Sequence, residues 1–200
     1  MNHFKIRAAT AADIPVLLTL IRELAEYEKL THKVVATESS LRKWFFGKHP
    51  VAEAVLGYLR GEPIAYAAFY PTFSTFSGQP GLYLEDLFVK RDYRGRGYGK
   101  AILRHVARIA KKKRFTTISW SVLDWNKPAI AFYRNLGGRP APNDWLVYTL
   151  PARALSDLAK DLDGDSGCRT LEPPHRCNAR LSVLLSTRGK GGSDGRQWWF

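Results

Sequence analysis

Apolar positions along residues 4–150 follow two different periods. Steps of three and four residues predict helices at about 14–25, 38–46, 97–112 and 126–136, with a further helical segment reaching about residue 160. Short alternating or continuous apolar runs between turn residues predict strands at 4–7, 51–59, 64–70, 82–89, 116–122 and 145–150. Strands come in succession in the first half of the chain and alternate with helices in the second. The pattern predicts a mixed α/β fold, with a central sheet that is antiparallel in its first half, partly parallel in its second, and flanked by helices.

Breaks in this pattern predict the domain organisation. Residues 71–80 are rich in Ser, Thr, Gly and Pro and predict a loop. Pro128 in the first turn and Gly137-Gly138 at the end bound the helix at 126–136. We expect one domain over residues 1–160. Residues 161–200 carry Gly, Pro and Ser in linker-like composition, and we expect a poorly ordered tail there.

Composition is typical of a soluble globular chain, with 45% hydrophobic and 24% charged residues. The longest apolar runs are much shorter than the roughly 20 residues of a membrane helix, and no secretion signal is recognisable. The sequence has only two cysteines, Cys168 and Cys177, both late in the chain, which argues against a disulfide scaffold, so we expect a reducing cytoplasm. No metal-ligand spacing is present.

The formal net charge of +13 indicates an attraction for anions, and almost all of the excess lies before residue 161. The charge does not say which anion, since RNA, a ribosomal surface and the phosphates of a cofactor all qualify.

A glycine-rich turn offers the first specific chemistry. In Arg94-Gly-Arg-Gly-Tyr-Gly99 three glycines alternate with larger residues between a predicted strand and a predicted helix. Backbone N–H groups at a helix N-terminus can hold a phosphate, and glycine permits close approach. The spacing fits neither the dinucleotide fingerprint nor the P-loop. A solvated glycine-rich connection remains an alternative for this segment taken alone.

Several segments together resemble the GNAT superfamily of N-acetyltransferases. Val89 to Gly99 resembles its Arg/Gln-x-x-Gly-x-Gly/Ala turn after a strand ending in Val. Tyr83-Leu-Glu-Asp-Leu-Phe-Val89 and Trp125-Asn-Lys-Pro-Ala-Ile-Ala-Phe-Tyr133 are similar to the corresponding strand and helix of its diamine (spermidine/spermine) acetyltransferases. Residues 6–13 and 23–28 also resemble that subfamily, so the likeness covers roughly residues 3–150. It implies the GNAT fold and direct attack of a neutral amine on the thioester of acetyl-CoA.

The resemblance implies a role for each matching residue. Glu85 is the candidate general base, acting through water, and Tyr133 the candidate general acid for the coenzyme thiolate. An ordinary salt-bridged strand acid and an ordinary core aromatic are the alternatives. Asp86 points away from Glu85 in a regular strand, unless the strand carries the bulge usual in the superfamily. Coenzyme contacts are expected at Leu87, Phe88, Val89, Arg94, Gly95, Arg96, Gly97, Tyr98, Gly99, Lys100 and Asn126.

The acceptor is less sharply defined. Tyr27, Glu28, Glu85, Asp86 and Trp145 match substrate positions of the diamine group. However, Lys29 to His32 lack that group's further acids, and the segment 71–80 contains none. We therefore expect a small cationic amine, which can be a polyamine, a diamine or a lysine-like amino acid. A protein N-acetyltransferase and a basic nucleic-acid-binding module without catalysis are the alternatives. We expect no nucleic-acid, membrane or metal partner, and a homodimer on the resemblance alone.

Overall fold

A computed structural model describes residues 3–140 and 147–163. Its centre is a five-stranded sheet in the order β1-β2-β3-β4-β5. The strands are β1 (Phe4–Ala8), β2 (Glu53–Leu59), β3 (Glu62–Ser74), β4 (Gln79–Val89) and β5 (Ile118–Ser119). The first four pair antiparallel and β4 pairs with β5 in parallel. The predicted class of sheet is therefore confirmed.

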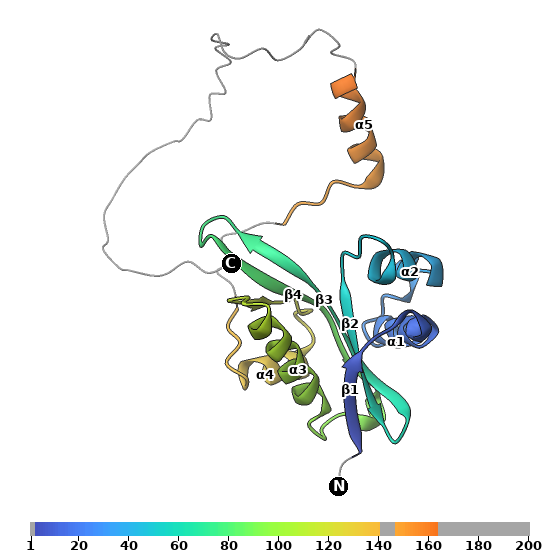
Figure 1. Ribbon diagram of the computed structural model, residues 1–200, viewed down its shortest axis with the longest axis vertical. Coiled ribbons are helices and arrows are strands. Elements are labelled where there is room, and N and C mark those ends of the chain that lie inside the picture. The colour runs from blue at the N-terminus through green and yellow to red at the C-terminus, as the bar shows by residue number, and fades with distance from the viewer. Residues whose placement is uncertain (1–2, 141–146, 164–200) are drawn as a thin grey trace, which may run out of the picture. The chain divides into compact units, whose positions relative to one another are not determined.

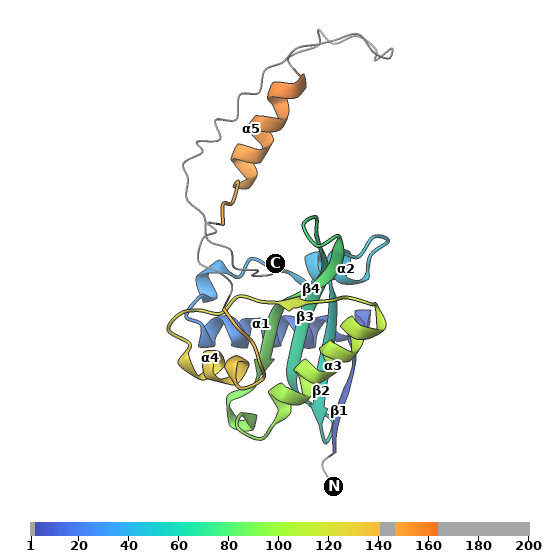
Figure 2. The same cartoon turned by 90° about the vertical axis from the view of Figure 1, so that its left-hand side faces the viewer.

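Helices cover both faces of the sheet (Figures 1 and 2). Helices α1 (Ile14–Tyr27) and α2 (Glu38–Phe46) lie on one face, while α3 (Tyr98–Lys112) and α4 (Lys127–Arg134) lie on the other. Short 3-10 turns occur at Ala11–Asp13, Thr31–Lys33 and Arg91–Tyr93. Contacts divide the chain between Arg139 and Pro140, and the described part of the second unit contains α5 (Ala152–Asp163). None of the described helices is long and apolar enough to cross a membrane.

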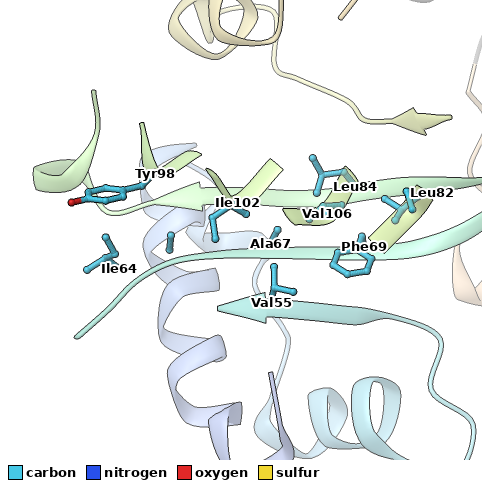
Figure 3. Packing of buried hydrophobic residues seen from close by; sticks show 11 residues of the cluster. Val55, Ile64, Ala67, Phe69, Leu82, Leu84, Tyr98, Ile102 and Val106 are labelled. Atoms are coloured by element: carbon cyan, nitrogen blue, oxygen red, sulfur yellow. The ribbon is translucent and has the colours of Figure 1, made fainter. Parts of the chain in front are cut away.

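Two cores explain why the buried stretch Ile64–Phe69 of β3 is continuously apolar rather than alternating. Its side chains point in turn to the two helical layers, and both layers exclude water. Ala67 and Phe69 face α3, where Ile102 and Val106 complete the packing, as Figure 3 shows. Tyr66 and Ala68 face α1 together with Leu17 and Leu20. This central strand therefore fixes the position of β4, which carries much of the candidate site.

The hairpin of β3 and β4 extends through most of the segment predicted as a loop. The pairing continues from Pro71 opposite Leu82 to Ser74 opposite Gln79, so the prediction of a loop over 71–80 is wrong except at its tip. The Leu82 N–H donates to Thr117 O at 3.0 Å, so this N–H group points away from β3. Pro71 therefore faces a position where no ladder hydrogen bond is made, and its missing N–H costs nothing.

Two predicted strands are shorter than their sequence patterns. Of 116–122, only Ile118–Ser119 pairs as a strand, against Leu82 and Tyr83. The predicted strand at 145–150 begins outside the described residues. Its described part, 147–150, is not a strand, and Val147 and Tyr148 are exposed. Alternating hydropathy marks a surface that could be half buried, but a strand also needs a neighbour to accept its backbone hydrogen bonds.

Candidate active site

The glycine turn lies between β4 and α3. Gly95 and Gly97 have φ angles of +73° and +84°, where side chains are strained, and an added Cβ at either would meet no atom within 4 Å. The first hydrogen bond of α3 runs from Ala101 N to Gly97 O. The N–H groups of Gly99 and Lys100 therefore have no partner within the helix. Open space over a positive helix end suits a diphosphate, so the turn fits the coenzyme that the sequence predicts.

The outer edge of β4 presents backbone donors beyond the point where β5 leaves it. Lys90 N donates to Ile64 O at 2.9 Å, so this pair is hydrogen-bonded across the ladder. Such pairs alternate along antiparallel strands, and the N–H groups of Leu87 and Val89 consequently point away from β3. On that side β5 pairs no further than Tyr83. These two N–H groups are thus placed to polarise a carbonyl oxygen beside the strand.

A bulge in β4 brings two carboxylates to the same side of the sheet. Ala68 pairs with Asp86 and Phe69 with Leu84, which leaves Glu85 as the extra residue. The bulge expected from the resemblance is present, and a regular alternation of Glu85 and Asp86 is excluded. Both residues line one pocket, with Glu85 exposed and Asp86 half-buried.

Asp86 has an environment that favours its protonated form. Burial raises the pKa of Asp86 to about 6, with smaller contributions from the charges of Glu85 and Glu28. Opposing this, the Tyr66 hydroxyl donates to Asp86 Oδ2 at 3.0 Å and stabilises the charged carboxylate. Burial also raises the pKa of Glu28, at the C-terminal end of α1. A cationic ligand would offset this concentration of negative charge.

Tyr133 lies on α4 with its ring 4.7 Å from that of Trp120 and 5.1 Å from that of Phe132. Burial, and secondly the charges of Glu28 and Asp86, raise the pKa of Tyr133 to about 12. This exceeds the ordinary phenol value near 10. The phenol is therefore protonated at neutral pH and can act as a donor. A bound cation between the two carboxylates and the phenol would lower this pKa.

Asn126 caps α4, as its residue type predicts. Its side-chain Oδ1 accepts from Ala129 N at 3.3 Å and from the Tyr27 hydroxyl at 3.1 Å. The Arg94 guanidinium lies over the Tyr27 ring, with Cζ 4.1 Å from its centre, and Arg94 Nε donates to Val89 O at 2.8 Å. Three segments far apart in sequence therefore meet at the end of α1.

One cavity of about 820 Å³ joins these features. It brings together Tyr27, Glu28, Glu85, Asp86 and Tyr133 with all but one of the residues predicted to contact the coenzyme. Those lining it are Leu87, Phe88, Val89, Arg94, Gly95, Gly97, Tyr98, Gly99, Lys100 and Asn126. Arg96 is not among the lining residues, and Trp145 lies outside the described residues. No group of three or more His, Cys, Asp or Glu side chains able to hold a metal occurs within 3–140 and 147–163.

Residues that sequence reasoning missed complete the site. Trp120 and Phe132 line the cavity beside Tyr133. Tyr66 is fully buried in β3, and its hydroxyl donates a hydrogen bond to Asp86 Oδ2. A tyrosine within the apolar run Ile64–Phe69 is the one sequence signal for it, since a buried hydroxyl usually needs a partner.

The Asp86–Tyr66 pair predicts a pH dependence. We expect kcat/KM for the amine to fall as the pH drops through about 6, because protonation of Asp86 removes a negative charge facing the amine. Tyr66→Phe removes a hydrogen bond that favours the charged form, so the acidic limb should move to higher pH. A bond worth about 0.5–1.5 kcal/mol predicts a two- to tenfold loss on that limb.

The control for this experiment is Tyr58→Phe. It also removes a hydroxyl that donates to a carboxylate, Asp13 at 3.1 Å, but away from the cavity. Its pH–rate profile should overlay that of the unchanged protein. Equal shifts in both variants would show that Tyr66 has no specific effect on Asp86.

Comparison with known proteins agrees with this geometry. The family model described as "Acetyltransferase (GNAT) family" matches residues 17–137. Thialysine N-epsilon-acetyltransferase of Sus scrofa is 37% identical over 169 residues, which covers 80% of this chain and 99% of that protein. L-ornithine N5-acetyltransferase of Arabidopsis thaliana is 28% identical, covering 78% and 88% of the two chains.

A solved structure supports the fold. The integron cassette protein from the mobile metagenome of V. cholerae superposes with a TM-score of 0.65 at 22% identity, over 79% of this chain and 98% of that one. The family itself is shown by the family model, which spans more than half of the sequence, and by the relative at 37% identity. The chain belongs to the GNAT family of acetyltransferases.

Proposed function

We propose that this enzyme transfers the acetyl group of acetyl-CoA to a primary amine of a small cationic substrate, with lysine-like amino acids and short diamines as the preferred class. One observation carries the proposal. A single cavity is lined by the three carboxylates Glu28, Glu85 and Asp86, by the half-buried phenol of Tyr133 and by the glycine turn. The relatives named for thialysine and ornithine acetylation support the same class of acceptor.

Each group has a defined task in this reaction. Bound acetyl-CoA supplies a thioester, whose carbonyl carbon is the electrophile. The N–H groups of Leu87 and Val89 donate to the carbonyl oxygen as negative charge develops there. Glu28 and Asp86 hold the cationic acceptor. These assignments divide the cavity into an anion-binding half at the glycine turn and a cation-binding half lined by Glu28, Glu85 and Asp86.

The two proton transfers use groups that differ in exposure, since Glu85 is exposed and Tyr133 is half-buried. The acceptor enters as an ammonium and must lose a proton before it can attack. Glu85 is exposed, so its carboxylate can take that proton through water and return it to solvent. Tyr133 Oη carries the proton required by the departing thiolate. The transfer leaves a phenolate on Tyr133, and the proton that the acetylated nitrogen loses as the amide forms restores the phenol, so the site returns to its starting charge.

An acceptor screen tests the proposal. Thialysine, ornithine, lysine, short diamines, spermidine and a lysine-containing peptide are each incubated with acetyl-CoA, and coenzyme release is measured. We expect turnover to be highest for the small amines that carry a second positive group. No turnover of any amine, together with no acetyl-CoA binding, would contradict the proposal. Preference for the peptide would favour protein acetylation instead.

A charge-neutral variant tests the cation-binding half. Glu28→Gln should raise KM for a diamine by about ten- to hundredfold, since a charge-assisted contact contributes about 1.5–3 kcal/mol, and leave KM for acetyl-CoA unchanged. Glu26→Gln is the matched control, because Glu26 lies two residues earlier in the last turn of α1, is exposed and does not line the cavity. Equal effects of the two substitutions would point to long-range charge rather than contact.

A cytoplasmic location and a homodimer stay predictions.

A further inference from the structure

Tyr27 is the last residue of α1. It lines the cavity where α1 meets the cap of α4 and the start of the glycine turn. Its ring and its hydroxyl have separate partners. The ring carries the Arg94 guanidinium at 4.1 Å, and the hydroxyl donates to Asn126 Oδ1 at 3.1 Å. The Trp125 ring lies 6.0 Å from it. An amine contact, as the sequence resemblance implies, would have to compete with these interactions.

The ring of Tyr27 restricts Arg94 at the start of the glycine turn. The guanidinium is held on two sides, by the Tyr27 face and by the bond from Nε to Val89 O. A free arginine loses rotamer entropy when it is ordered by a ligand. Because Arg94 is already ordered beside the turn, less of the binding free energy of a phosphate is lost to ordering this side chain.

The hydroxyl of Tyr27 acts on a different element. Asn126 Oδ1 accepts a hydrogen bond from Ala129 N within α4 and one from Tyr27 outside it. The second bond ties the cap of α4 to the end of α1. Helix α4 carries Tyr133 two turns further on. Fixing the cap therefore restricts the direction in which the helix presents the phenol.

We propose that Tyr27 is a positioning residue that links the two halves of the reaction, and that it does not serve mainly as an amine contact. Its ring orients Arg94 for the coenzyme phosphates, and its hydroxyl holds α4 in place for proton delivery from Tyr133. This inference rests on the proposed function of the cavity, since it assigns the phosphates and the proton to those two ends.

Two substitutions separate the two tasks. Tyr27→Phe keeps the ring and removes the hydroxyl, so kcat should fall by about two- to tenfold, the equivalent of one hydrogen bond, with KM for acetyl-CoA unchanged. Tyr27→Leu also removes the aromatic face under Arg94. Because Arg94 is exposed, a cation–π contact of about 0.5–1 kcal/mol predicts a further two- to fivefold rise in KM for acetyl-CoA. KM for the amine should stay the same in both.

Direct binding of coenzyme A, measured by calorimetry, provides a readout that does not depend on turnover. Tyr27→Leu should weaken it and Tyr27→Phe should not, while Glu28→Gln should bind coenzyme A normally and lose affinity for the amine. A rise in amine KM for both Tyr27 variants, with normal coenzyme binding, would overturn the inference. Indistinguishable effects of Phe and Leu would overturn it as well. Absence of turnover in the unchanged protein would instead count against the proposed function.

Discussion

Tyr133→Phe should lower kcat by about 10²–10³-fold, within the range ascribed to general acid catalysis. The substitution keeps the aromatic ring against Trp120 and Phe132 and removes one oxygen. A thiolate leaving within the cavity would then have no phenol to protonate it. Steady-state kinetics with the best acceptor from the screen measure the effect.

Binding data decide whether the loss of kcat reflects the proton-transfer step or weaker binding of the coenzyme. Coenzyme A should bind Tyr133→Phe with unchanged affinity, because the glycine turn proposed to hold its phosphates lies between β4 and α3, away from α4. The pH profile should keep its acidic limb, which belongs to Asp86. An unchanged kcat would remove Tyr133 from the acid role, and a raised KM with an unchanged kcat would reassign it to binding.

Gly97→Val should act on the coenzyme instead. Gly97 has a φ of +84° at the N-cap of α3, and a left-handed conformation costs an ordinary residue about 1–2 kcal/mol and a β-branched one more. The added methyl groups would also enter the open space above the turn. We expect affinity for coenzyme A to fall at least about tenfold, the equivalent of 1.4 kcal/mol, in calorimetry and in KM for acetyl-CoA.

Gly61→Val is the matched control for strain. Gly61 has a φ of +87° in the turn between β2 and β3, also has no atom within 4 Å of an added Cβ, and does not line the active-site cavity. Both variants should lose a similar amount of thermal stability, but Gly61→Val should bind coenzyme A normally. Equal loss of binding in the two would mean that strain, and not the phosphate turn, is responsible.

Local patterns predicted the helices and the ends of most elements well. Helix 38–46 was predicted with the bounds that α2 has, and Gly137 has the left-handed φ of +90° expected at a helix stop. These features depend on residues near in sequence. The chemistry of the site required the family resemblance, because nothing local distinguishes Tyr133 from a core aromatic.

Features that depend on distant partners were missed. The ladder that extends β3 and β4 through residues 71–80 depends on pairing geometry, so its Pro and Ser content was misleading. The bond from Tyr66 to Asp86 joins residues 20 positions apart, and that from Tyr27 to Asn126 joins residues 99 apart. No period or turn signal along a single segment contains such information. Trp145 stays a prediction.

The bulge at Glu85 constrains how β4 can vary. Before it, the even-numbered Leu82 and Leu84 face α3, and after it the odd-numbered Leu87 and Val89 pack on that same core. Removing one residue here would reverse the orientation of either the start or the end of the strand. Substitutions at Glu85 should therefore affect activity alone, whereas a one-residue deletion would expose half of a core. Such a strand tolerates changes of residue type far better than changes of length.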